Sequence, residues 1–166
     1  MPSLPNPLPP VVRHLTSIAP SGKCIFAPPR LTQLIPKAVL PDGRVPGRFA
    51  NLFVTDKWKP DVRNPDLSEG ENGSKLLVSM GGANFRVTDI APRTKGKMHS
   101  TPSLDFLVVH KGKVTLHLDS GEKAVINEGE AIVQRGTVHA WENESETEWA
   151  RMFVVLLDAD GAVQHH

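Results

Sequence analysis

His99, Asp105 and His139 are the residues of this chain whose types and spacing best suit chemistry. Two imidazoles and one carboxylate form a ligand set for a divalent metal ion that leaves coordination positions open. The same three groups also suit acid–base catalysis without a metal. The spacing leaves both chemistries open, and both require a fold that brings the three side chains together.

The direction of the Asp105 side chain follows from the expected strand Leu104–His110. Residues two apart on a strand share a face, so Asp105 lies on the same face as Leu107 and Val109. A carboxylate among apolar side chains is costly to bury without a partner. This pattern favours a buried and paired Asp105, and a water-facing carboxylate at the strand edge is the alternative.

Four further residues are candidates for contact with a substrate. Trp141 follows His139 by two positions on an expected strand and shares its face, where it either lines a pocket or packs in the core. His117 lies on either the inner or the outer face of its strand. Arg86 suits an anionic group if it is not simply at the surface. Thr101 lies close in sequence to the first histidine.

Short segments of strand-like composition, separated by turn residues, dominate the chain after residue 72. They are Lys75–Met80, Asn84–Ala91, Leu104–His110, Val114–Leu118, Lys123–Ile126, Ala131–Gln134, Val138–Glu142 and Trp149–Leu157, with Lys23–Phe26 and Phe49–Thr55 before them. Strands of this length and spacing predict an all-β sandwich or barrel. Leu31–Val39 has helix-like apolar spacing, but Pro36 interrupts it, so we expect at most a short helical turn.

Proline divides the chain, because thirteen of its 15 prolines lie at or before Pro65. The segment Pro2–Pro10 can build neither a helix nor a central strand, so it is expected to be extended or disordered. We predict an extended arm over residues 1–22 and one β-barrel domain over 23–160. Residues 161–166 are expected to be a disordered tail, native or the remnant of a purification tag.

Composition narrows the partners and the location. The formal net charge is +1, without a long basic run, so neither nucleic acid nor an anionic membrane is expected as a partner. No apolar stretch is long enough to span a membrane. The first residues lack the pattern of a signal peptide, so a cytoplasmic protein is expected.

Cys24 is the single cysteine, which excludes an internal disulfide, and we expect it to be a small buried residue.

The segment from Gly96 to Gly112 resembles the first sequence motif of the cupin family. His99 falls on the first histidine of that motif, Asp105 on its glutamate and Gly112 on its closing glycine. The second histidine of the motif is replaced by Thr101. The acidic ligand is also one methylene shorter than the glutamate of the family.

The segment from Gly129 to Asn143 resembles the second cupin motif. His139 and Asn143 fall on its histidine and asparagine, and Gly136 on the glycine before that histidine. The proline of the motif is absent, with Gln134-Arg135 near its place, and the spacing back to Gly129 is one residue short. A full cupin site has three histidines and a glutamate, whereas this chain keeps two histidines and an aspartate.

The resemblance covers residues 13–158 and is strongest to small single-domain cupins associated with fungal and bacterial polyketide and other small-molecule pathways. It implies a double-stranded β-helix, or jelly-roll, barrel with an irregular proline-rich N-terminal arm. It further implies a divalent metal (Fe, Mn or Zn) held by His99, Asp105 and His139, no nucleotide cofactor, and a homodimer.

The same resemblance leaves the reaction open, because this fold hosts many chemistries. With a metal, the expected enzyme is a dioxygenase, or a decarboxylase or other lyase, acting inside the barrel on an oxygenated polyketide-like or aromatic small molecule. Without a metal, acid–base chemistry would suit a dehydratase, isomerase or cyclase. The non-enzymatic alternatives are a barrel that binds a small ligand and a purely structural role for the three polar residues.

Overall fold

All regular elements in the described part of the chain are β-strands. The computed structural model describes residues 6–63 and 77–162. Its strands are β1 (Val11–Arg13), β2 (Thr16–Ile18), β3 (Cys24–Phe26), β4 (Arg30–Thr32), β5 (Ile35–Pro36), β6 (Gly47–Thr55), β7 (Ala83–Ile90), β8 (Thr94–Lys95), β9 (Ser103–Lys111), β10 (Val114–Leu118), β11 (Lys123–Ile126), β12 (Ala131–Arg135), β13 (His139–Asn143) and β14 (Ala150–Asp158). The expectation of an all-β fold is confirmed.

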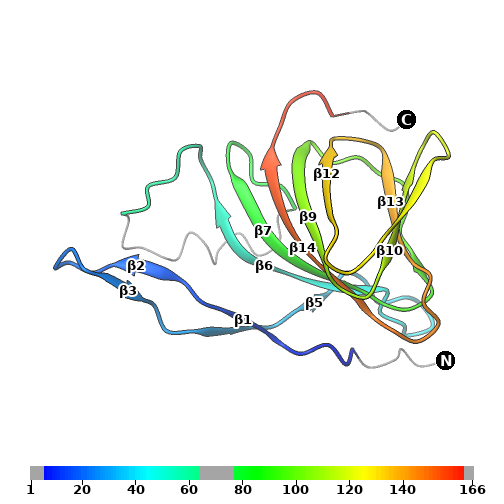
Figure 1. Cartoon of the computed structure of the whole chain (residues 1–166), viewed down its shortest axis with the longest axis horizontal. Helices are drawn as coiled ribbons and strands as arrows, with labels where there is room; N and C mark the ends of the chain where they lie inside the picture. Colours follow the sequence, from blue (N-terminus) through cyan, green and yellow to red (C-terminus); the bar gives the residue numbers. More distant parts are fainter. Residues whose placement is uncertain (1–5, 64–76, 163–166) are drawn as a thin grey trace.

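Two sheets face each other to form the barrel (Figure 1). The larger sheet has the strand order β12-β9-β14-β7-β6-β5, and the smaller has the order β11-β10-β13-β8. All the pairings within them are antiparallel. In Figure 1, β9, β12 and β14 of the larger sheet lie beside β10 and β13 of the smaller one, with the barrel interior between them.

The interior of the barrel is filled by the residues that strand alternation predicts. On β9, Asp105, Leu107 and Val109 are buried, whereas Phe106 and Val108 between them are exposed. The inward apolar residues form two clusters between the sheets. One comprises Ile90, Val109, Val114, Ala150 and Met152, and the other Leu107, Val154 and Leu156. Burial of these side chains is the main stabilising contribution to the closed barrel.

Two motif glycines occupy turns that need a left-handed backbone. Gly112, between β9 and β10, has φ +74°, and a Cβ there would lie 3.2 Å from the carbonyl oxygen of Trp149. Gly136, which follows β12, has φ +57°. Glycine adopts this region without the steric cost that a Cβ imposes, so both turns depend on it. These turns set the ends of the strands that carry Asp105 and His139.

The N-terminal arm, which in the structure runs past residue 22 and covers residues 6–34, projects from one side of the larger sheet (Figure 1). It consists of two small antiparallel sheets, β1 with β4 and β2 with β3. Near the barrel, Val11 and Leu34 pack against a cluster of Ala50, Leu52 and Val87 on the outer face of the sheet. The base of the arm is therefore part of the folded core, while β2 and β3 extend beyond it.

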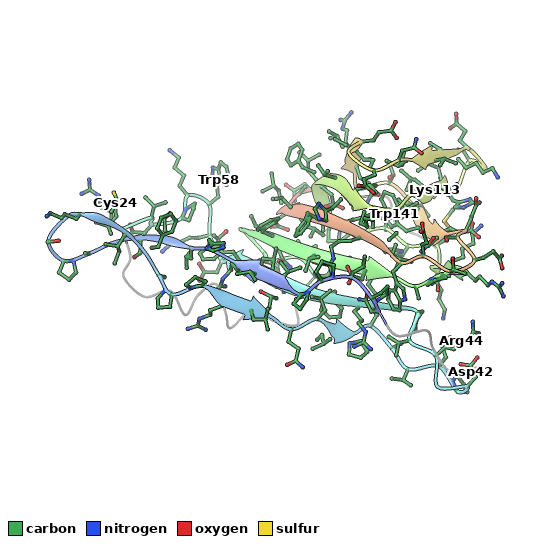
Figure 2. All side chains as sticks on the ribbon, turned by 60° about the horizontal axis from the view of Figure 1, so that its bottom comes forward. Cys24, Asp42, Arg44, Trp58, Lys113 and Trp141 are labelled. Carbon is green, nitrogen blue, oxygen red and sulfur yellow. The ribbon has the colours of Figure 1, made fainter. Side chains whose placement is uncertain are left out.

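Two expectations from the sequence, a strand at Lys75–Met80 and a buried Cys24, are wrong. The described part of the segment Lys75–Met80, residues 77–80, forms bends and a turn; residues 75 and 76 lie outside the described ranges. The segment Leu31–Val39 has no helical turn, which is compatible with the expectation of at most a short one, and its residues 31–32 and 35–36 pair as strands in β4 and β5. Cys24 is exposed rather than buried, since β3 lies far out on the arm (Figure 2). The domain limits at residues 22 and 160 stay a prediction.

Candidate functional site

Strand register places Asp105 near the start of β9, between β12 and β14 of the larger sheet. On β9 it lies opposite Gln134 of β12 on one side and Leu156 of β14 on the other. Opposite residues of an antiparallel pair point to the same face. Asp105 and Gln134 therefore both point into the barrel, where they are 4% and 5% exposed. The prediction of a buried and paired Asp105 is confirmed, with an amide as the partner.

His99 and His139 are joined through their backbones. The His99 N–H donates to the His139 carbonyl oxygen at 2.9 Å, and the His139 N–H donates to the His99 carbonyl oxygen at 2.8 Å. This isolated antiparallel bridge ties the loop before β9 to the first residue of β13. The two imidazole centroids are consequently 4.5 Å apart. The sequence placed these histidines about forty residues apart, and the fold makes them neighbours.

Hydrogen bonds fix which ring nitrogen of each histidine faces the site. Nδ1 of His99 lies 2.9 Å from the Lys97 carbonyl oxygen, and Nδ1 of His139 lies 2.8 Å from the Thr137 carbonyl oxygen. A carbonyl only accepts, so Nδ1 of each ring donates a proton. In the neutral rings Nε2 then carries a lone pair. This tautomer is the one in which Nε2 can ligate a metal or accept a proton.

Gln134 connects the carboxylate to the second histidine. Its Nε2 donates to Asp105 Oδ2 at 3.1 Å and lies 3.2 Å from His139 Nε2. Since His139 Nε2 is an acceptor, the amide presents its NH₂ group to both partners. Gln134 is not among the site residues predicted from the sequence. Its signal was the replacement of the proline of the second motif by a polar pair, but only the β12–β9 register shows which member points inward.

Asp105 Oδ1 and Gln134 Oε1 are buried without a hydrogen-bond partner. The Ser103 hydroxyl also lacks a partner of good geometry, but it is close enough to Asp105 to lower the pKa of that carboxyl and it can donate. Buried polar atoms are normally paired, so the two unpartnered acceptors call for an explanation. The lone pair on Nε2 of His99 adds a further acceptor. The site therefore has an excess of acceptors, which a divalent cation or a hydrogen-bond-donating ligand would satisfy.

The protein environment shifts two protonation equilibria at the site in opposite directions. Burial raises the pKa of Asp105 above 3.8, although hydrogen bonds from Ser103 and Gln134 and the nearby His99 partly offset this. Burial lowers the pKa of His139 below 6.5; the Thr137 carbonyl opposes this shift, and His99 adds to it. Both effects favour the uncharged form of the side chain. His139 is accordingly a neutral acceptor around pH 7.

His99, Asp105 and His139 do not form a closed triad of ligands. In the described ranges, one trio of His, Cys, Asp or Glu residues brings its ligand atoms within 4.8 Å of one another, and it is another one: His117, Glu142 and Glu144. In the predicted site, the Gln134 amide stands between Asp105 and His139. Asp105 and His139 are therefore buried at one end of the barrel, His99 is exposed beside His139, and Gln134 connects Asp105 to His139.

His117 is not part of this site, contrary to the prediction. On β10, Leu118 lies opposite His139 and shares its inward face, so His117, one residue earlier, points outward. There its Nε2 lies 2.7 Å from Glu142 Oε2. The phase of β10 relative to the barrel decides this placement, and either phase was compatible with the sequence.

The other candidate contacts lie in different parts of the interior. Trp141 meets the ring of His139 edge-on at a centroid distance of 6.1 Å and packs against the inner cluster of Leu107, so it packs in the core, while its contact with a substrate stays a prediction. Figure 2 shows Trp141 within the barrel. Arg86 is buried on the inner face of β7, where its Nε donates to Asn51 Oδ1 at 2.8 Å. Thr101 is buried in the loop before β9.

Two surface hollows border the described part of the barrel. One of about 720 Å³ opens around Glu128, Asn143 and Trp149, at the end of β9 opposite to Asp105. A smaller one of about 230 Å³ is lined by residues that include Ser103 and Gly136 and lies at the end of the barrel that carries the site. The larger hollow contains none of the predicted site residues, whereas the smaller one reaches Ser103.

Sequence similarity to known proteins identifies the family of this chain. The cupin domain model matches residues 86–156, which include His99, Asp105, Gln134 and His139. The cupin-domain-containing oxidoreductase virC of Hypocrea virens is 32% identical over 154 residues, which covers 89% of this chain and 75% of that protein. The chain belongs to the cupin family, and its barrel is a cupin double-stranded β-helix.

The alignments with other relatives cover a smaller share of those proteins. Phomopsin biosynthesis cluster protein D of Diaporthe leptostromiformis is 46% identical over 79 residues, which make up 48% of this chain and 42% of that protein. This chain thus aligns with less than half of that relative.

Among solved structures, the polyketide cyclase RemF of Streptomyces resistomycificus is similar, with a TM-score of 0.46 and 18% identity over 67% of this chain and 64% of that chain. In the described residues no helix has the length and apolar character needed to cross a membrane.

Proposed function

We propose that this protein is an enzyme of small-molecule biosynthesis that modifies an oxygenated, polyketide-like or aromatic substrate inside the barrel, with a divalent cation at His99, Asp105 and His139. Decarboxylation or another lyase reaction and dioxygenation are the reaction types that this site suits. The names of similar proteins support a role in secondary metabolism, since they include cupin-domain oxidoreductases and proteins of biosynthesis clusters.

The observation that carries this proposal is the excess of acceptors at the site. Two imidazoles directed by backbone carbonyls, together with a buried carboxylate that has one unpartnered oxygen, match the nitrogen and oxygen ligands of Fe, Mn or Zn. Asp105 and His139 are buried, whereas His99 is exposed. Each buried polar atom left without a cation or a donor costs about 1–3 kcal/mol. The chemistry of the donor set therefore fits a divalent cation, which would have to draw together ligand atoms that do not all lie within 4.8 Å of one another here.

The positions of the two histidines, Asp105 and Trp141 suggest a separate role for each side chain. His99 and His139 would hold the cation through Nε2, because the Lys97 and Thr137 carbonyls keep Nδ1 protonated and orient the rings. Asp105 would contribute the negative charge. A bound cation would supply Lewis acidity toward a bidentate enolate, catecholate or β-keto acid. Trp141 would form an apolar wall of the substrate site beside His139.

Metal content of the purified protein tests the proposal. The measurement is elemental mass spectrometry on protein without His165 and His166, which would bind metals themselves. The variant His117→Ala serves as a control, because it removes the outer trio of His117, Glu142 and Glu144. We expect about one ion per chain, retained in His117→Ala and lost in His139→Ala. An ion lost in His117→Ala and kept in His139→Ala would place the metal outside the barrel and contradict the proposal.

A second candidate function is metal-free acid–base catalysis, as in a dehydratase, isomerase or cyclase. The hydrogen bonds from Gln134 to Asp105 and His139 favour it, because they form a continuous polar chain between a potential acid and a potential base. His139 would take a proton at Nε2, and protonated Asp105 would donate one. Absence of bound ion after incubation with Fe, Mn and Zn salts, together with turnover unaffected by a chelator, would favour this candidate over the first.

A further inference from the structure

We propose that Gln134 is itself a ligand of the cation, through its side-chain oxygen Oε1, and supplies the coordination that the second histidine of the cupin motif would give. This inference rests on the proposed function, since it names a fourth protein ligand for the same cation. The position of that histidine is occupied by Thr101, which has no imidazole to offer.

The Gln134 amide lies at distances from Asp105 and His139 that are typical of neighbouring ligands of one metal ion. Its Nε2 atom stands 3.1 Å from Asp105 Oδ2 and 3.2 Å from His139 Nε2. Adjacent ligands of an octahedral ion with bonds of about 2.0–2.2 Å are themselves about 3 Å apart. The terminal atom of Gln134 thus already has ligand-to-ligand spacing from both neighbours.

Rotation of the amide by half a turn about the last side-chain torsion would place Oε1, the atom that can bind a metal, where Nε2 now lies. The two ends of a glutamine amide have nearly the same shape, and the last side-chain torsion is a soft one. Without a cation, the NH₂ end faces Asp105 and His139 because both are acceptors, while Oε1 is buried without a partner. With a cation, the same acceptors would bind the ion, and Oε1 would join them.

Charge and ligand type also agree with this assignment. The family pattern combines three neutral imidazoles with one carboxylate, which gives the protein ligands a charge of −1. Two imidazoles, one neutral amide and Asp105 keep that charge. A carbonyl oxygen is a harder ligand than an imidazole, so the exchange favours manganese or iron(II) over softer ions.

The opposite role for Gln134 is that of a competitor, whose NH₂ group blocks the ligands. The two roles predict opposite effects of removing the amide. As a ligand, Gln134 increases affinity, and its loss should weaken binding by about ten- to a hundredfold, as for other metal-site contacts. As a competitor, it decreases affinity, and its loss should strengthen binding.

Titration with Mn²⁺, followed by electron paramagnetic resonance of the free ion, separates the two roles. All proteins would lack the terminal histidines and carry His117→Ala, so that the outer trio does not contribute. We expect Gln134→Leu, which keeps the approximate volume, to weaken Mn²⁺ binding at least tenfold. Gln134→Glu, which keeps an oxygen ligand, should bind within a few-fold of the parent or more tightly. Equal or tighter binding by Gln134→Leu would overturn the proposal.

A second measurement observes the amide directly. In ¹⁵N-labelled protein, the side-chain NH₂ signals of Gln134 are identified by their absence in Gln134→Leu, and Zn²⁺ should shift them more than those of Gln33 on the arm. Thermal unfolding shows whether each variant is folded. A parent protein that binds no cation would refute the metal-dependent function and this inference together. Binding lost in His139→Ala but unchanged in Gln134→Leu would refute the inference alone.

Discussion

Arg151 and Asp89 form a two-bond ion pair on the outer face of the larger sheet, beneath the start of the N-terminal arm. Arg151 Nε donates to Asp89 Oδ1 at 2.6 Å and Nη2 donates to Oδ2 at 2.7 Å. The arm completes the pair: Asn6 donates to Asp89 Oδ2 at 2.6 Å, and the Pro9 carbonyl accepts from Arg151 Nη1 at 2.7 Å. Asp89 is 0% exposed and Arg151 is 4% exposed.

Replacing Arg151 with Met should destabilise the protein by about 3–5 kcal/mol, because it leaves the Asp89 carboxylate buried without its cation. Chemical denaturation measures the loss. The matched control is the double variant Asp89→Leu/Arg151→Met, which removes both charges and should recover most of the stability. If the single variant were as stable as the wild type, the pair would have no structural role.

The ionised Asp105 side chain should reduce the stability of the metal-free protein. Its pKa is raised above 3.8 by burial, so the folded state loses stability as the pH rises from 3.8 through the higher folded-state value. Asp105→Asn removes the charge and keeps the acceptor that Gln134 uses. We expect this variant to melt at a higher temperature than the wild type at pH 7 after chelator treatment, and to bind no cation. A lower melting temperature would contradict this explanation.

His139 should make the metal-free protein sensitive to mild acid. Its pKa is lowered below 6.5 by burial, so the unfolded state binds more protons between the folded-state value and 6.5. The contribution of His139 to stability should therefore fall as the pH drops through that window and level off above pH 6.5, where the imidazole is neutral in both states. Melting temperatures between pH 5 and 8 test this, with His139→Asn as the control, which should show a smaller slope. An equal slope in both proteins would assign the effect to other groups.

We propose that the protein forms a homodimer through the outer face of the larger sheet. Val133, Phe106, Val155 and Phe85 lie opposite one another across β12, β9, β14 and β7. The side chains of Phe85, Phe106 and Val133 are 40–59% exposed. The same face already accepts the base of the arm, where Val11 packs against it.

A second copy is the occupant that fits, because the outer part of the arm also exposes apolar side chains. Phe26 is 73% exposed and Leu31 is 68% exposed. Two-stranded ribbons are marginally stable alone, so a partner surface would stabilise β2 and β3. A two-fold dimer would let each arm lie on the other copy's apolar row.

Sedimentation velocity tests this arrangement. The wild type should sediment as a dimer, and Phe106→Lys should shift it toward the monomer. Val125→Lys, on the exposed surface of the smaller sheet, should leave the dimer intact. Observation of an 18.1 kDa species alone for the wild type would remove the dimer proposal.

Much of the barrel could be predicted from local pattern. The strands Val114–Leu118 and Lys123–Ile126 have the predicted ends, because tight turns with glycine at positive φ separate strongly alternating segments. The arm was harder to predict. Its segments have no buried face of their own, so the periodicity that marks a strand is weak there, and Cys24 was misplaced for that reason.

The site was predictable where it follows a motif and not where it departs from one. His99, Asp105 and His139 have recognisable spacing. Gln134 does not, because its role depends on the pairing of β12 with β9, which joins residues 29 positions apart. The outward position of His117 depends in the same way on a register that a single sequence does not specify.

We predict that the backbone bridge between His99 and His139 forms late in folding. Its two hydrogen bonds join a loop and a strand that β9, β10, β11 and β12 separate in the chain, and contacts between residues so far apart carry a large entropic cost of loop closure. A partly folded chain, or one whose rim opens transiently, therefore has no assembled pair of imidazoles. Exchange of the two backbone amide protons with deuterium would report the lifetime of the competent state, residue by residue, before any substrate is known.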